Sequence, residues 1–225
     1  MVPLLVLGTF LIFILLDWLL SRNKLTQPIM AMAPSRAHAL PRVDPEHVEG
    51  FLVPDKLAYH PGHSWLAHER RNLVRVGADE FAAALAGSLE KIELPKPGQW
   101  IRQGQKAWSL IRNGEKAEMV SPTEGEIVEV NQELLRDPSL LRRDPYGRGW
   151  VATVDVPDEE STTRNLVPAG LVRTWMRDAV SRLYARQPQL AGAVAADGGR
   201  PAEDLLAGMP EANWKEVAGE FFLTA

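Results

Sequence analysis

Two histidines, His60 and His63, have an H-x-x-H spacing that could ligate a metal ion. Pro61 and Gly62 stand between them, and a Pro-Gly pair favours a turn rather than a regular element that would align the two imidazoles. A complete ligand set would require further ligands, and neither a third histidine nor an acidic motif accompanies the pair. We therefore expect a structural role for both histidines and predict no metal site.

The other residue types used in catalysis form no recognisable motif. The 225-residue sequence has no cysteine, which excludes disulfides, thiolate metal clusters and a cysteine nucleophile. It has no Walker or dinucleotide-binding glycine pattern, no serine in a nucleophile elbow and no recognisable Ser-His-Asp set. The sequence therefore predicts a protein that is not itself an enzyme.

One lysine, Lys116, lies close to a predicted β-hairpin turn. Residues 107–112 and 116–120 have the pattern of half-buried strands, and they flank the dipeptide Asn113-Gly114. Asn-Gly is a preferred dipeptide for a two-residue type I′ turn, because both of its central residues need positive φ. We expect the tip of the hairpin at Asn113 and Gly114, with Lys116 in the returning strand.

This hairpin belongs to a region of short predicted strands, residues 59–157. Further strands are expected at residues 72–76, 91–94 and 126–130 and around 150–154. One helix is expected among them, because Phe81 and Leu85 share a helical face. Asp79 is a suitable N-cap for this helix, and Gly87 suits the left-handed position after its end. The pattern predicts a mainly β fold, a small sandwich or barrel with a helical insertion.

Residues 158–225 are predicted to form an α-helical extension. A regular apolar stripe indicates a helix over about 168–187; its members are Val172, Trp175, Met176, Ala179, Val180, Leu183 and Tyr184. Beyond a glycine-rich break, Pro201 and Pro210 are expected to start two short helices, and Trp214, Val217 and Phe221 form the apolar stripe of the second. These stripes must pack either on the protein's own domain or on a partner.

Arginines lie on the other faces of the longer predicted helix. They are Arg173, Arg177, Arg182 and Arg186, which form two i,i+4 pairs. Such a basic face is either simply solvated or in contact with anionic lipid headgroups. We expect no nucleic-acid partner, because the whole chain has a net charge of -4.

The N-terminal residues 2–20 form an apolar run with a single ionisable residue, Asp17. Such a run is just long enough to cross a bilayer core of about 30 Å as a helix. A cleaved signal peptide is the alternative, but it would begin with basic residues and end with small ones. We predict an uncleaved transmembrane anchor within residues 1–24, followed by a proline-rich linker over 25–58.

Basic residues follow this run, and the amino terminus alone provides positive charge before it. Arg22 and Lys24 come directly after the apolar residues. Because positive charge is retained in the cytoplasm, the larger part of the chain is expected there. The sequence predicts a single-pass protein of the cell inner membrane whose main domain is cytoplasmic.

The central region also contains five motifs that occur in the same order in a known family. They are Tyr59 with His63-Ser64-Trp65, then residues 76–82, 93–98, 121–131 and 144–150. On these motifs the region resembles the H protein of the glycine cleavage system, a relative of lipoyl domains. The resemblance implies a lipoyl-type barrel-sandwich hybrid fold. It also implies a lysine at a hairpin tip that carries lipoate through an amide and swings between partner enzymes.

The expected position of that lysine is occupied by glycine. In the family pattern the lysine lies seven residues before a Ser-Pro pair, and counting back from Ser121 reaches Gly114, which cannot be lipoylated. Ile111 replaces the acidic residue that usually precedes the lysine, and Arg112 adds a positive charge that we expect beside the tip. This departure from the family pattern predicts a membrane-anchored, H-protein-like interaction or structural module that lacks lipoate.

Lys116 keeps an alternative open, because Lys116-Ala117 matches the Lys-Ala of the family motif. A deletion of two residues between the modified lysine and Ser121 would bring it into register. The protein would then be a lipoyl carrier that shuttles between partner enzymes of a glycine cleavage-like or redox system. Against this, such a deletion would shorten a paired strand whose register the turn fixes.

Overall fold

The computed structural model describes residues 15, 46–158, 162–186, 204–207 and 213–224. Apart from Leu15, the described residues all belong to one compact unit, Val43–Ala225. The predicted anchor, apart from Leu15, and the predicted linker as far as residue 45 lie outside the described residues. Within the described ranges, no helix is both long and apolar enough to cross a bilayer.

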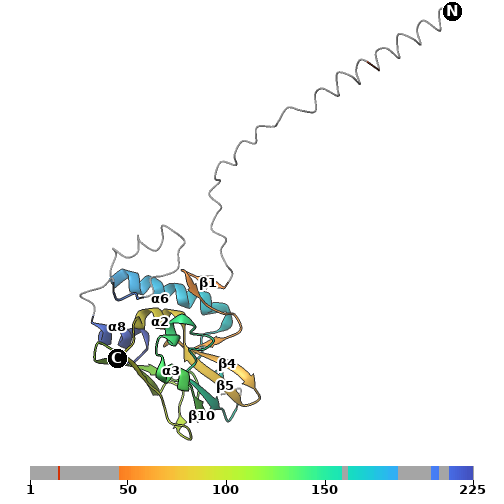
Figure 1. The fold of residues 1–225 in the computed structure, drawn as a ribbon. Coiled ribbons are helices and arrows are strands. Elements are labelled where there is room, and N and C mark those ends of the chain that lie inside the picture. Colours follow the sequence, from red (N-terminus) through yellow and green to blue (C-terminus); the bar gives the residue numbers. More distant parts are fainter. Residues whose placement is uncertain (1–14, 16–45, 159–161, 187–203, 208–212, 225) are drawn as a thin grey trace, which may run out of the picture. The chain divides into compact units, whose positions relative to one another are not determined.

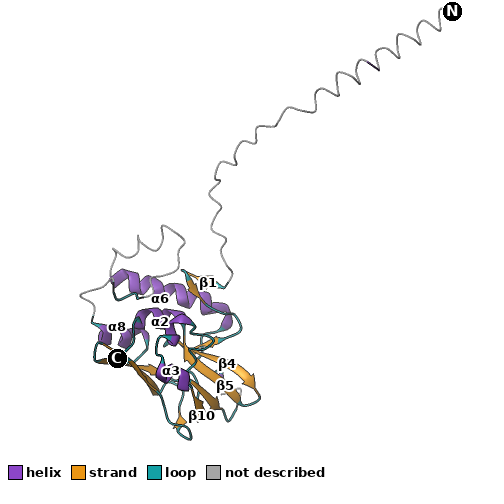
Figure 2. Cartoon of the chain, viewed as in Figure 1, coloured by secondary structure: helices purple, strands orange, loops and turns teal. Residues whose placement is uncertain are grey.

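Two antiparallel sheets form the centre of the described chain (Figure 2). The larger has the strand order β3 (Ala58–Tyr59), β4 (Ser64–Arg70), β5 (Leu73–Ala78), β11 (Ala152–Asp155), β10 (Gly125–Val130), β7 (Trp100–Ile101). The smaller has the order β6 (Lys91–Glu93), β8 (Lys106–Arg112), β9 (Glu115–Val120). Buried side chains from both sheets, among them Trp65, Ile101 and Leu110, belong to one hydrophobic core. The mainly β class predicted from the sequence is confirmed.

The helix expected after β5 is present as α2 (Glu80–Ala86). Asp79 caps its N-terminus, since the Asp79 side chain accepts a hydrogen bond from the Ala82 amide. Gly87 follows its last residue with φ +62°, a backbone conformation that glycine adopts without steric cost. The local sequence thus determines both ends of this helix.

The expectation of a single helix within the β region is wrong. Two further short helices, α3 (Gln132–Arg136) and α4 (Leu140–Arg143), lie between β10 and β11. Asn131 caps α3 by accepting hydrogen bonds from two backbone amides of its first turn. Helices of five and four residues are too short to show an apolar period, which explains why the sequence pattern did not reveal them.

The last part of the predicted linker is folded. Strands β1 (His47–Val48) and β2 (Phe51–Leu52) pair as a small hairpin. The side chains of Val48, Phe51 and Val53 are buried in the common core. Tyr146 Oη donates a hydrogen bond of 2.6 Å to the Leu52 carbonyl, which attaches this hairpin to the domain.

The helical extension packs on its own domain. After a 3-10 turn (Ala169–Leu171), α6 spans Val172–Arg186, and α8 spans Trp214–Phe221. The predicted stripes are largely buried. The buried residues are Val172, Met176, Ala179, Val180, Leu183, Trp214, Val217 and Phe221. In Figure 1, helices α2, α6 and α8 gather at one side of the sheets. The starts of the helices expected from Pro201 and from Pro210 lie outside the described residues, and residues 204–207, which are described, form a turn and not a helix.

Candidate functional site

The tip of the β8–β9 hairpin is the position where a lipoyl-type domain would carry its cofactor. Arg112 and Glu115 are the last paired residues, so Asn113 and Gly114 form the turn between them. Their φ values are +51° and +75°, as a type I′ turn requires. Both residues are exposed, and no described neighbour comes within 4 Å of a Cβ built on Gly114. The apex of the hairpin therefore presents an asparagine and a glycine.

Glu90 supports this turn from the neighbouring segment. The Gly114 amide donates a hydrogen bond of 3.1 Å to Glu90 Oε2. Glu90 could not be predicted from the sequence, because the contact depends on the pairing of β6 with β8, which places Lys91 opposite Ile111.

Lys116 lies within the returning strand, not at the apex. It is paired with Ile111 across the ladder. Its Nζ donates a hydrogen bond of 2.9 Å to Glu93 Oε2 on β6, so the lysine side chain reaches across β8. This hydrogen bond raises the pKa of the Lys116 ammonium and lowers that of the Glu93 carboxyl. Half of the Lys116 side chain remains exposed, so the pair is a surface interaction that contributes little to stability.

The backbone of Arg112 flanks the turn, but its positive charge does not lie beside the tip, as the sequence had led us to expect. Its Nη1 donates hydrogen bonds to the Ala86 carbonyl at 3.0 Å and to Asp204 Oδ1 at 2.8 Å. Only 12% of its side chain is exposed. The guanidinium is drawn away from the tip because the C-terminal end of α2 and a carboxylate together satisfy its donors.

The two histidines of the H-x-x-H motif make different buried contacts. His63 Nδ1 donates to Asp79 Oδ2 at 2.8 Å, and its ring stacks on Phe81 and on Trp175. His60 Nδ1 accepts a hydrogen bond of 3.0 Å from the Gly62 amide. Burial, and to a smaller extent the neighbouring His63, lower the pKa of His60 to about 4. Across the described ranges, no group of three potential metal-ligating side chains occurs.

The arginines at the start of α6 contact the N-terminal hairpin. Arg173 Nη2 donates to the His47 carbonyl at 3.3 Å. Arg177 Nε lies 3.6 Å from Oε1 of Glu49, the residue that follows β1. These contacts hold β1 against α6.

The arginines near the end of α6 contact α8. The guanidinium of Arg182 lies over the Phe221 ring, 5.2 Å from its centroid. Arg186 pairs with Glu216 at 3.3 Å and also with Glu220. Intramolecular contacts thus explain where these side chains lie, and lipid binding by the four arginines stays a prediction.

Comparison with known proteins identifies the family of this chain. The family model described as "Glycine cleavage H-protein" matches residues 57–178, more than half of the chain. The chain belongs to the glycine cleavage H-protein family. Its resemblance to that family, first drawn from five motifs, is thereby confirmed.

Individual relatives match over about half of the chain. The glycine cleavage system H protein of Thermobifida fusca is 36% identical over 107 residues, which are 48% of this chain and 84% of the relative. The glycine cleavage system H protein of Coprothermobacter proteolyticus is 35% identical over 106 residues, which are 47% of this chain and 84% of the relative. A solved H protein from Mycobacterium marinum has 29% identity and a TM-score of 0.43, with 47% of this chain and 87% of the other covered.

Proposed function

We propose that this chain is a non-lipoylated H-protein-like interaction or structural module of a cytoplasm-facing complex, anchored in the inner membrane by residues 1–20. One observation carries the proposal. The apex of the β8–β9 hairpin is Asn113-Gly114, and neither side chain has an amine that could form an amide with lipoate. A type I′ turn formed by these two residues is complete in itself, so the hairpin needs no lysine at its tip.

The position of Lys116 supports the same conclusion. A swinging arm works because its attachment point projects from a tip and moves freely between partners. Lys116 instead lies in a paired strand, and its ammonium is bound by Glu93. A ligase would have to separate this pair and deprotonate an amine whose pKa the pair raises.

A carrier with lipoate on Lys116 is the second candidate, and one observation favours it. The side chain is half exposed and lies two residues from the turn, so an enzyme could reach its amine from solvent. The protein would then shuttle intermediates between partner enzymes of a glycine cleavage-like or redox system.

In vitro lipoylation distinguishes the two candidates. The full chain is incubated with a lipoate ligase, ATP and lipoate, alongside Lys116→Arg and the double variant Ile111→Glu/Gly114→Lys. The double variant restores both the tip lysine and its acidic neighbour, at a strain cost of about 1 kcal/mol for a lysine with positive φ. We expect modification of the double variant alone. Modification of the unchanged chain that is lost in Lys116→Arg would overturn the proposal and establish the carrier.

The membrane attachment rests on the sequence of the N-terminal region. Residues 2–20, in which Asp17 is the single ionisable residue, form an apolar run of a length that matches a bilayer core, and Arg22 and Lys24 follow at one end. Anchoring would hold the H-protein-like domain near the membrane whether or not it carries lipoate.

A further inference from the structure

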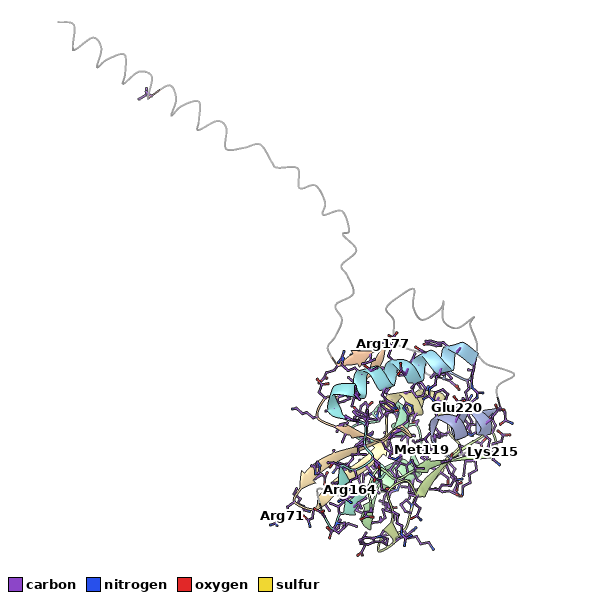
Figure 3. All side chains as sticks on the ribbon, turned by 180° about the vertical axis from the view of Figure 1, so that it is seen from behind. Arg71, Met119, Arg164, Arg177, Lys215 and Glu220 are labelled. Atoms are coloured by element: carbon purple, nitrogen blue, oxygen red, sulfur yellow. The ribbon has the colours of Figure 1, made fainter. Side chains whose placement is uncertain are left out.

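The C-terminal segment, residues 204–207 and 213–224, lies outside the part of the chain that matches the H-protein family, residues 57–178. It nevertheless covers part of that domain. Strand β9 is at the edge of the smaller sheet, and α8 contacts both β9 and α2. Figure 3 shows this arrangement from behind, with Glu220 and Lys215 on α8 and Met119 on β9. The segment is thus an addition that is packed on a family domain.

The centre of this contact is apolar and aromatic. Phe221 and Phe222 are almost completely buried, as are Trp214 and Val217. The Phe221 ring lies 5.2 Å from the ring of Phe81 and 6.2 Å from that of His63, both in the family domain. Aromatic side chains at the centre of a contact are typical of protein interfaces.

Polar contacts surround this centre. At one end Asp204 binds Arg112, and the Leu205 amide donates to the Ala84 carbonyl at 3.1 Å. At the other end, the Thr224 carbonyl accepts a hydrogen bond of 3.0 Å from Lys106.

Two further polar contacts belong to this rim. Thr224 Oγ1 donates to the Glu118 carbonyl of β9 at 3.2 Å. Between the two ends, Glu216 pairs with Arg186 of α6. An apolar centre with a polar rim is the anatomy of a docked ligand.

Two glycines of the domain make room for the segment. A Cβ on Gly62 would lie 2.9 Å from the Phe222 carbonyl oxygen and 2.8 Å from Val120 Cγ2. A Cβ on Gly87 would lie 2.4 Å from the Asp204 carboxyl carbon and 2.4 Å from Arg112 Nη1. The two glycines therefore leave room for the backbone at Phe222 and for the side chain of Asp204.

We propose that α2, β9 and the end of α6 form a helix-docking surface, and that the C-terminal segment occupies it in cis as a separable ligand. The ligand class is an amphipathic helix that begins and ends with an aromatic residue, as α8 does with Trp214 and Phe221, and that is followed directly by a second aromatic residue, Phe222. Its carboxylates face Arg186. This inference goes beyond the proposed function, because it holds whether or not Lys116 carries lipoate.

The test uses the full chain with a protease site inserted between Gly198 and Gly199. After cleavage, an isotopically labelled synthetic peptide of residues 204–225 is added, and native mass spectrometry follows the complex. We expect the cleaved fragment to stay bound and the labelled peptide to replace it. A peptide with Phe221→Asp should compete at least roughly a hundredfold less well, because a carboxylate would enter the aromatic centre.

Two glycine variants of the cleaved protein provide a matched pair. Gly62→Ala should weaken retention of the fragment, whereas Gly170→Ala should not, because no described atom lies within 4 Å of a Cβ at Gly170. Loss of the folded domain on cleavage, a fragment that never exchanges, or an exchanged dimer in which each copy binds the other's segment would each overturn the proposal.

Discussion

Asp79 joins His63 to the start of α2. Its Oδ2 accepts a hydrogen bond from His63 Nδ1 at 2.8 Å, while its Oδ1 accepts one from the Ala82 amide at 2.8 Å. Both side chains are fully buried. Because the His63 ring also stacks on Trp175 of α6, a single carboxylate orients the opening turn of the domain, the inserted helix and the C-terminal extension.

Replacement of Asp79 tests this relationship. Asp79→Ala removes the helix cap and leaves the buried His63 Nδ1 without its acceptor, which should cost about 2–4 kcal/mol of unfolding free energy. Asp79→Asn keeps an oxygen for one of these donors and should cost clearly less. Urea unfolding at pH 7 measures both values. Equal losses for the two variants would show that the hydrogen bonds accepted by the Asp79 carboxylate contribute little to stability.

A charge in the apolar stripe of α6 should separate the extension from its domain. Trp175→Asp would place a carboxylate against the rings of Tyr59 and His63 and should cost several kcal/mol. Thr174→Asp is the matched control, because Thr174 is an exposed residue of the same helix. Thermal unfolding of both variants checks the prediction. Equal melting temperatures would mean that the stripe does not pack as the structure shows.

The local parts of this structure could be predicted, since they depend on short sequence signals. Asp79 and Gly87 define both ends of α2, and apolar periods identified α6 and much of α8. The surface against which α6 and α8 pack could not be predicted. An apolar stripe reveals that a face is buried but contains no information about which surface covers it.

The candidate site shows the same division. The position of Asn113-Gly114 follows from the turn preference of one dipeptide. The partner of Lys116 does not, because Glu93 is 23 residues away and is brought close only by the pairing of β6 with β8. The direction of the Arg112 side chain could not be predicted for a similar reason, since its partner Asp204 comes from the distant C-terminal segment.

Acid should destabilise the fold partly through His60. Its pKa is about 4 in the folded state against an ordinary value of 6.5, so the unfolded chain binds the proton more readily between these values. The stability contributed by neutral His60 is therefore complete above pH 6.5. It is lost progressively as the pH falls to 4, by about 3 kcal/mol in total.

His60→Asn provides the comparison, because an amide oxygen can still accept a hydrogen bond from the Gly62 amide. Unfolding free energies at pH 7 and pH 4.5 should differ less in His60→Asn than in the unchanged chain. An identical pH dependence in both would contradict the buried, neutral state of His60.

The orientation of the proposed anchor can be tested on spheroplasts, whose outer membrane is opened so that added protease reaches the outer face of the inner membrane. Because Arg22 and Lys24 follow the apolar run, the domain after residue 24 should be cytoplasmic and resistant to externally added protease. Removal of the domain while a cytoplasmic marker survives would reverse the orientation.

The intact mass of the protein purified from its native cells tests the central claim most directly. The structure places Asn113 and Gly114 at the hairpin apex and holds Lys116 in the returning strand against Glu93. We predict a mass without any lipoyl group, together with an unmodified peptide containing Lys116. A stoichiometric increase equal to one lipoyl amide on that peptide would contradict the account and identify the protein as a carrier.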